Sequence, residues 1–308
     1  MYNTNKMKFY LVILFTFISS ILCFSQQDSQ YTQYMYNTTL INPAYAGSRE
    51  VLSAFILHRN QWMGLEGAPV TNNFSINSPI GDSNFGIGLN FVNDKIGPVS
   101  ENEISVDLAY FIQISENYKF SIGLKGTANL FDLDVNKLRI FDPTDPQFQN
   151  VKTEFSPNIG AGAYLFSDKT YFGLSVPNFF ESYRYNDNNI EISKQKLHLY
   201  FIAGHVFKIS DNIDFKPALL SKIVEGAPIQ ADVTGNFLFF DKLTLGAAYR
   251  WNAAVSALAG FQISDSWFIG YGYDLETTKL ANYNSGSHEI FLRYELFNKT
   301  KISAPRFF

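Results

Sequence analysis

The chain has 308 residues and a formal net charge of -4, with no run of five or more basic residues, which argues against a nucleic-acid-binding surface. Its single cysteine, Cys23, lies in the first apolar stretch, so the rest of the chain has no disulfide framework and no thiolate metal site. Aromatic residues make up 17% and charged residues 17%, and the charged share is below the roughly 25% of soluble domains.

The N-terminus has the pattern of a secretory signal peptide. Lys6 and Lys8 precede an apolar run from Phe9 to Phe24, which is shorter than the ~20 residues that a membrane-spanning helix needs. Polar residues follow Ser25, so residues 1–25 are predicted to be removed near that position. A lipoprotein signal acylated on Cys23 is the alternative, but it requires a small residue where Leu22 stands. Residues 26–50 follow as a periplasmic or lumenal segment before the first strand.

From residue 51 onward the apolar residues alternate with polar ones instead of forming long runs. In "EISVDLAYFIQI", Ile104, Val106 and Leu108 share one face of a strand, and Ser105 and Asp107 share the other. The stretches "KFSIGLKGTAN", "VTNNFSIN", "FGIGLNF", "KLTLGAAYRW" and "HEIFLRYELF" repeat this period. No segment after residue 25 is long and apolar enough for a membrane-spanning helix.

Short and long connections take turns between these strands. The short ones are "GDSN", "SENY", "SDKT", "SDN", "FDK" and "SDS", whose residues favour tight turns. The longer ones are "RNQWMGLEGAP", "NDKIGPVSENE", 132–156, 178–196, "KIVEGAP" and "LETTKLANYNSGS", and "RWNA" is a short exception. This rhythm predicts an all-β fold, a transmembrane antiparallel β-barrel of about 14 strands over residues 51–308, located in the outer membrane.

An even strand number places both termini on the short-turn, periplasmic side. A soluble sandwich or propeller is the alternative, but sandwiches lack this short-long rhythm and propellers repeat at a nearly fixed length. If the apolar faces meet lipid, six charged side chains line the lumen: Asp107, Lys125, Arg250, Glu289, Arg293 and Glu295. Lumen lining is their expected role, because Lys or Arg on the lipid face costs about 2–4 kcal/mol at mid-depth.

Catalytic and metal-binding patterns are missing from the sequence. The four histidines have no ligand spacing, and "HEIFL" is not a zinc motif because Leu292 stands at its fifth position. There is no G-x-S-x-G motif and no Gly-rich phosphate loop. Carboxylates gather in the connection 132–156, where solvated charge is the expected role and weak calcium binding the alternative: Asp134, Asp142, Asp145 and Glu154. We therefore expect a non-enzyme without cofactor or metal.

Several blocks in order resemble the PorP/SprF family of type IX secretion system outer-membrane proteins. They are "QYMYNTTLINPAYAGS", "RNQWMGLEGAPVT", "GIGLNFVNDKIGP", "GYGYDLETTKL" and "GSHEIFLRYEL", and they extend from about Gln30 to the C-terminus. Thr38 stands where the family tends to have proline. The resemblance implies a barrel without catalytic residues that supports export or surface attachment of large cargo proteins such as gliding adhesins, whose C-terminal sorting domain is recognised. It also implies other type IX secretion components as partners, besides outer-membrane lipid.

The stretch "LINPAYAGS" fits a plug that enters the lumen. Small residues keep it thin, Pro43 stiffens it, and the residue before a proline is biased to an extended backbone. In this interpretation Tyr34, Tyr36 and Tyr45 fill the lower lumen; an ordered periplasmic lead-in to the first strand is the open alternative. The candidates for the family motif and the plug are Asn42, Pro43, Ala44, Tyr45, Ala46, Gly47, Arg59, Gln61, Trp62 and Gly64.

The connection 178–196 is a candidate partner-docking loop, together with 132–156. Aromatic residues and arginine dominate interface hot spots, which selects Phe179, Phe180, Tyr183, Arg184 and Tyr185. An aromatic girdle at the membrane boundary is the alternative role. For the whole chain, the alternative function is an outer-membrane uptake channel for a hydrophobic or small polar solute. A barrel lipase or acyltransferase would need a Ser-His pair that the sequence does not reveal.

Overall fold

The computed structural model describes residues 31–138, 153–180, 183–187, 190–194 and 196–296; in 183–187 and 190–194 it describes the backbone alone. The predicted signal peptide, the stretch "DPTDPQF", Asp142 and Asp145 lie outside these ranges. Within the described residues, no helix has the length and apolar character needed to cross a membrane.

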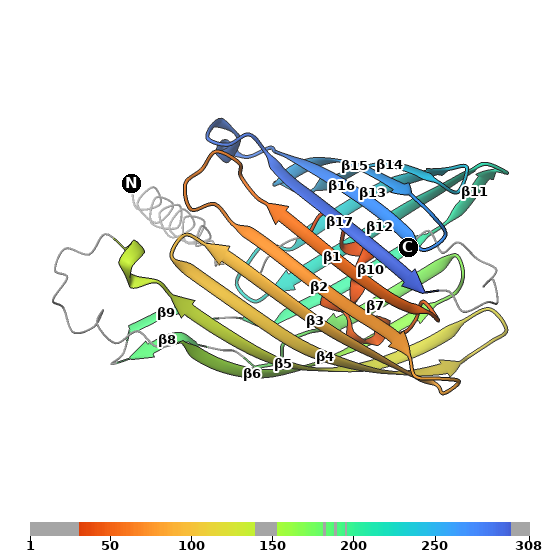
Figure 1. Ribbon diagram of the computed structural model, residues 1–308, viewed down its shortest axis with the longest axis horizontal. Coiled ribbons are helices and arrows are strands. Elements are labelled where there is room, and N and C mark those ends of the chain that lie inside the picture. The colour runs from red at the N-terminus through yellow and green to blue at the C-terminus, as the bar shows by residue number, and fades with distance from the viewer. Residues whose placement is uncertain (1–30, 139–152, 181–182, 188–189, 195, 297–308) are drawn as a thin grey trace, which may run out of the picture.

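Strands dominate the chain and form a closed antiparallel barrel of 14 strands (Figure 1). The wall consists of β1 (Leu52–Asn60), β2 (Val70–Pro79), β3 (Phe85–Ile96), β4 (Val99–Gln113), β5 (Lys119–Leu133), β6 (Glu154–Phe166), β7 (Thr170–Val176), β10 (His198–His205), β12 (Ile213–Val224), β13 (Gln230–Phe239), β14 (Leu243–Arg250), β15 (Ala254–Gln262), β16 (Trp267–Glu276) and β17 (Ser287–Leu296). Pairing of β1 with β17 and of β10 with β12 closes the cylinder. The short β11 (Phe207–Ser210) follows β10 after Val206 and pairs with the same neighbour, β12, so it adds no wall strand. Closure leaves no sheet edge to face hydrocarbon, as a membrane requires.

The alternating faces of the strands point as the sequence predicts. On β5, the side chain of Leu124 faces outward and is 65% exposed, whereas the adjacent Lys125 is 2% exposed inside the barrel. All six charged side chains expected in the lumen are buried there: Asp107, Lys125, Arg250, Glu289, Arg293 and Glu295. The outer surface is therefore apolar and suited to lipid, and the inner surface is polar.

The two ends of the barrel differ in their connections. At the short-turn end, tight turns join β2 to β3, β4 to β5, β6 to β7, β11 to β12, β13 to β14 and β15 to β16. At the long-loop end lie the remaining connections, among them the segments after β5 and β7. In Figure 1 the long-loop end is on the left, where β8 and β9 are labelled, and β17 ends on the right. β1 begins and β17 ends at the short-turn end, as an even strand number requires.

One predicted long connection is instead a tight hairpin. "NDKIGPVSENE" was expected to be a loop, but β3 continues to Ile96 and β4 starts at Val99, so only Gly97 and Pro98 join them. Polar residues on both faces of these strand ends resemble a loop in sequence, yet Asn93 donates to Asn102 across the hairpin at 2.8 Å. Gly97 takes a left-handed φ of 56°, which a tight turn favours.

The connections at the long-loop end also contain structure that the sequence analysis did not anticipate. β8 (Tyr183–Asp187) and β9 (Ile190–Lys194) form a separate two-stranded sheet within the connection 178–196. The 3-10 turn η4 (Val135–Lys137) lies in the connection after β5, and η5 (Lys279–Asn282) lies in the connection between β16 and β17. These elements make the long-loop end a structured surface.

The lipid-facing assignment predicts that the effect of a charge depends on its depth. Leu124→Arg should lower the free energy of unfolding by about 2–4 kcal/mol, since Leu124 faces outward from the interior of β5. Phe155→Arg, at the long-loop end of β6, should lower it by about 0–1 kcal/mol. Both can be measured by denaturant unfolding in lipid vesicles, and equal losses at the two depths would contradict the lipid-facing assignment.

Candidate functional site

The segment 31–48, hereafter the plug, lies inside the barrel and is buried along most of its length (Figure 1). It contains three 3-10 turns, η1 (Tyr34–Tyr36), η2 (Thr38–Leu40) and η3 (Pro43–Tyr45). Its polar groups bond to inward side chains or carbonyls of β1, β2, β3, β5, β6, β7, β16 and β17. The plug therefore spans the lumen from wall to wall.

A buried ion cluster holds the beginning of the plug. Arg59 on β1 pairs with Asp274 on β16 at 2.7 Å and with Glu289 on β17 at 3.1 Å. Glu289 accepts the backbone N–H groups of Thr32 and Gln33 at 3.1 and 2.9 Å. The Thr32 hydroxyl donates to Asp274 and accepts from Arg59 at 3.0 Å. We call Arg59, Asp274 and Glu289 the anchor, because it joins three strands to the plug.

The middle of the plug is tied to the opposite wall. Asn37 donates to Asn73 and Ser75 on β2, each at 2.8 Å. Lys125 on β5 donates to the carbonyl of Thr39 at 3.1 Å and forms an ion pair with Asp107 at 3.3 Å. These contacts satisfy polar groups that would be costly to bury alone.

The Asn-Pro-Ala motif is a helix cap that also bonds the wall. The Asn42 side chain accepts the N–H of Ala44 at 3.0 Å, so it caps η3, and Pro43 takes the first position of that turn. The side-chain amide nitrogen of Asn42 donates to the carbonyl of Ala163 on β6 at 3.0 Å. The Asn42 side chain thus fixes both the conformation of η3 and the distance between η3 and β6.

Glycines on the inner wall make room for this motif. A Cβ atom at Gly123 would collide with the backbone of Ala44, and one at Gly162 would collide with the Asn42 side chain. Gly86 lies equally close to the carbonyl of Ala46. The small residues of "NPAYAG" therefore do keep the plug thin, and the wall is cut back at the same places.

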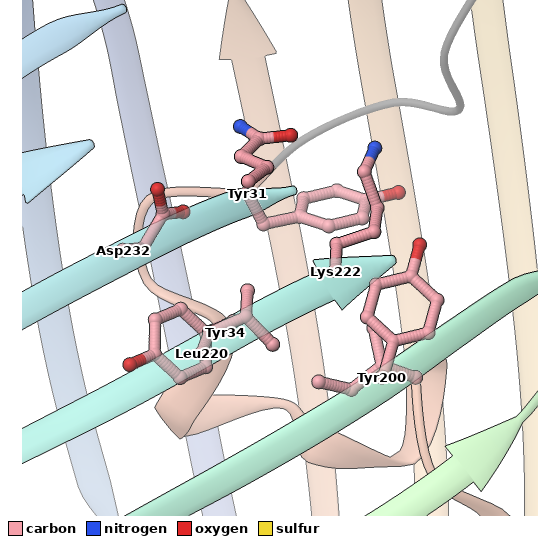
Figure 2. Close-up of a pocket in the computed structure, with 8 residues that line it drawn as sticks. Tyr31, Tyr34, Tyr200, Leu220, Lys222 and Asp232 are labelled. Carbon is pink, nitrogen blue, oxygen red and sulfur yellow. The ribbon is translucent and has the colours of Figure 1, made fainter. Parts of the chain in front are cut away.

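The described part of the plug runs from the long-loop end of the barrel to the short-turn end. Tyr34 was predicted to fill the lower, short-turn part of the lumen together with Tyr36 and Tyr45. Instead, the first described residues meet the anchor near the long-loop ends of β1, β16 and β17, and the chain then returns to β1 at the short-turn end. Tyr34 lies beside Lys222 and Asp232 near the long-loop end (Figure 2). The local sequence specifies a thin segment but not its direction.

Aromatic rings pack the remainder of the plug. The Tyr36 ring lies 5.4 Å from Phe268 and 4.8 Å from Phe291, between centroids. The Tyr45 ring meets Tyr164 edge-on at 5.5 Å. Tyr36 and Tyr45 thus fill the lumen, as the plug interpretation expects.

The block after Arg59 forms a braced loop outside the lumen. Trp62, with a φ of 51°, donates its indole N–H to Glu276 at 2.8 Å, and its backbone N–H goes to Ser287. Gln61 bonds through its backbone to Pro69. Gly64 has a φ of 97°, and a Cβ there would meet nothing. This block therefore ties the β1–β2 connection to the β16–β17 connection beside the anchor.

The docking-loop candidates lie at the long-loop end, away from the plug. Phe179 and Phe180 are 42% and 55% exposed, and their backbone N–H groups bond to Ile159 and Asn158 of β6. The backbones of Tyr183, Arg184 and Tyr185 belong to β8, and their side chains lie outside the described part of the chain. The two phenylalanines are fixed in position and available for contact.

A small pocket opens beside the start of the plug (Figure 2). Tyr31, Tyr34 and Tyr200 supply aromatic surface, and Lys222 and Asp232 supply charge; Ile41, Leu220 and Gln230 complete the lining. The pocket combines an apolar lining with a few polar groups, as small-molecule sites do.

The sequence analysis missed part of this site. Asp274 and Thr32 of the anchor region were not selected, although the inward position of Asp274 follows from the alternation of β16. The glycines in the predicted strands could have indicated the site as well. Glycine weakens a strand, so its presence inside one often marks a place where another backbone approaches closely. Over the described residues, no group of three or more His, Cys, Asp or Glu side chains is placed to hold a metal ion. Asp134 instead pairs with Lys137 at 3.3 Å.

The wall glycines predict a variant that displaces the plug. Gly123→Val should push Ala44 away from β5 and raise single-channel conductance in planar bilayers, where the native barrel should be nearly closed. Gly126→Val is the matched control, because a Cβ atom added there would meet nothing within 4 Å. Equal conductance of the two variants would mean that the plug does not depend on this contact.

The anchor predicts a second variant with a different signature. Arg59→Gln leaves Asp274 and Glu289 buried without their shared cation, which should cost about 3–5 kcal/mol of stability. The beginning of the plug should loosen, so conductance should flicker between closed and open levels. Lys119→Gln, which breaks a half-exposed pair with Glu50, should change stability by less than about 1 kcal/mol. If the Arg59→Gln variant has native stability and its conductance stays at the closed level, the anchor does not hold the plug.

Comparison with known proteins yields one family and a set of structural neighbours. No curated protein matches the chain. Three solved structures illustrate the likeness, each with a TM-score of 0.48. The Acinetobacter baumannii outer membrane protein Omp33 is 6% identical and covers 80% of this chain and 99% of its own. The Ralstonia pickettii toluene transporter TbuX is 9% identical, with 84% and 92% covered. The CymD monoaromatic hydrocarbon channel is 12% identical, with 88% and 94% covered.

The family match covers most of the chain. The profile of the family described as "Type IX secretion system membrane protein PorP/SprF" matches residues 23–294, which include the plug and all strands of the barrel up to β17. The resemblance first noted in the sequence blocks is thereby confirmed. The chain belongs to the PorP/SprF family of type IX secretion system membrane proteins and is an outer-membrane β-barrel.

Proposed function

We propose that this barrel is a non-enzymatic component of the type IX secretion system that supports export or surface attachment of large cargo proteins, such as adhesins with a C-terminal sorting domain. Family membership gives the secretion context. The observation that carries the proposal is the filled lumen. The plug bonds to β1, β2, β3, β5, β6, β7, β16 and β17, so free diffusion through the barrel is not its evident task. Contact with partners then falls to the surfaces outside the lumen.

The long-loop end is the surface that we assign to cargo. Short turns face the periplasm in outer-membrane barrels and long loops face outward, so the exported domain would meet the connections after β5 and β7. Phe179 and Phe180 are fixed by β6 and exposed there, which suits aromatic anchors of an interface. Other secretion components would meet the same barrel at its lipid-facing or periplasmic surfaces.

The alternative function, uptake of a hydrophobic or small polar solute, has one observation in its favour. The pocket beside Tyr31 and Tyr200 opens near the long-loop end and has an apolar, aromatic lining (Figure 2). A solute bound there would still face the plug. Uptake would therefore require the plug to move, whereas cargo docking does not.

Gene deletion and loop variants test the proposal in cells. Deletion should remove one large surface protein while general outer-membrane integrity is kept, and trimming 132–156 and 178–196 should reproduce the loss with the barrel still assembled. Phe179→Ser combined with Phe180→Ser should lower surface cargo about tenfold if both are interface anchors. Tyr283→Ser is the matched control, a 70% exposed aromatic on another long connection.

The assays are surface proteomics and the gel mobility of the barrel before and after boiling. A knockout that displays every surface protein normally but fails to grow on one nutrient would replace secretion with uptake. Normal cargo levels in the phenylalanine variant, beside a loss in the trimmed one, would move the docking surface to other residues of the loops.

A further inference from the structure

The outer surface of β1 to β4 carries a row of polar side chains where the rest of the wall is apolar. These strands lie side by side in the barrel (Figure 1). The row consists of His58 on β1, Asn72 on β2, Asn93 on β3 and Asn102 on β4, hereafter the polar row. By the alternation of each strand, its members point outward with the exposed apolar residues two positions away, which are Ile56, Phe74, Phe91 and Ile104.

Hydrogen bonds join the polar row from strand to strand, and its members are direct partners in the sheet register. The Nδ1 atom of His58 lies 2.8 Å from the Oδ1 atom of Asn72, whose amide nitrogen donates to Asn93 at 3.4 Å. Asn93 donates in turn to Asn102 at 2.8 Å. Each asparagine has two amide N–H groups, and these bonds use at most one of them. Donors are therefore left on the outer surface of the barrel.

The register places the polar row inside the apolar band. The row lies between Ile290 on β17, which is paired with His58, and Leu130 on β5, which is paired with Asn102. Ile290 and Leu130 both face outward and are 46% and 38% exposed. A line of paired residues changes its depth steadily around a barrel, because the strands tilt. The polar row therefore lies at a depth between two lipid-facing apolar residues.

Lipid alone is a poor neighbour for such a row. Polar groups without a partner are costly to place against hydrocarbon, and outer-membrane barrels normally place aromatic rings at the edges of the apolar band. Tyr271 on β16, which is paired with Ile290, supplies such a ring on the same register line. Polar side chains at membrane depth commonly form hydrogen bonds between neighbouring transmembrane elements. The polar row thus indicates a protein neighbour on this side of the barrel.

We propose that the polar row is the centre of an interface with a second copy of this chain, related by a two-fold axis along the membrane normal. A side-chain amide both donates and accepts, so the same row on two copies is self-complementary, as a two-fold interface requires. The row contains no carboxylate, ammonium or guanidinium group, so a strongly charged partner would gain no ion pair from it. Phe74 and Phe91, 37% and 39% exposed, supply apolar packing beside the row.

The plug holds this part of the wall in place from the inside. Asn37 donates to Asn73 and Ser75 on β2, and the Thr39 hydroxyl donates to Asn90 on β3 at 3.0 Å. The two strands at the middle of the polar row are thus tied to the filled lumen. A surface that is already fixed loses little conformational freedom on association, which favours binding of the second copy.

Single cysteines test the interface in the native membrane. Asn72→Cys and Asn93→Cys are introduced separately into a Cys23→Ser background, which has no other cysteine, and intact cells are oxidised. Both positions lie at the middle of the row and approach their own counterparts across a two-fold axis. A disulfide-linked band of twice the barrel mass is expected. Tyr249→Cys, an outward and 46% exposed position on β14, is the matched control and should stay monomeric.

Apolar variants show whether the polarity of the row holds the two copies together. Asn72→Leu combined with Asn93→Leu should raise the dissociation constant of the dimer roughly tenfold or more, measured by analytical ultracentrifugation in detergent. Tyr249→Leu should leave that constant unchanged, and all variants should keep the gel shift on boiling that reports a folded barrel.

Three results would overturn the proposal. A cysteine adduct of any other mass would show that a different protein covers the polar row. No adduct at either asparagine position would show that lipid covers it. An unchanged dissociation constant in the doubly substituted barrel would show that its polar groups do not hold the copies together.

Discussion

The requirement that buried polar groups be bonded controls this structure. Closing fourteen strands into a cylinder satisfies the wall's backbone, and alternation then directs half of the side chains into a lumen lined with amides, hydroxyls and charges. The plug meets this requirement with its own polar groups. Thr32, Asn37 and Asn42 each bond to a different part of the wall, so the plug is part of the interior of the barrel rather than an appendage.

Ion pairs fix the plug at both ends of the lumen. Arg59, Asp274 and Glu289 lie at the long-loop end, where Glu289 accepts N–H groups from the start of the plug. Arg49, which directly follows the plug, pairs with Glu295 on β17 at the short-turn end. Both ends of the plug are thus held to the wall by charged side chains.

Complementary small residues explain why the plug stays close to the wall. Glycines on β3, β5 and β6 lie opposite the Asn-Pro-Ala stretch, which removes side-chain volume from both surfaces. Backbone groups can then approach closely enough for Asn42 to bond with both η3 and β6. For the secretion role that we propose, this fit means that the barrel presents fixed surfaces to its partners and does not rely on an open lumen.

The sequence by itself determined the barrel, its strand number and which faces meet lipid, because alternation and turn composition are local properties that closure does not alter. It also selected the residues of the plug, since small, rigid and aromatic residues in that order have a local meaning. Tertiary structure decided the rest. The direction of the plug depends on Glu289 and Asp274, which lie more than 200 positions from Thr32 along the chain.

The β3–β4 hairpin and the pairing of β8 with β9 also escaped the sequence, since polar strands outside the membrane have the composition of loops. The anchor could not be read in advance for a related physical reason. Arg59, Asp274 and Glu289 come together only through the strands that the closed barrel pairs, and that pairing is settled by the register of the whole cylinder.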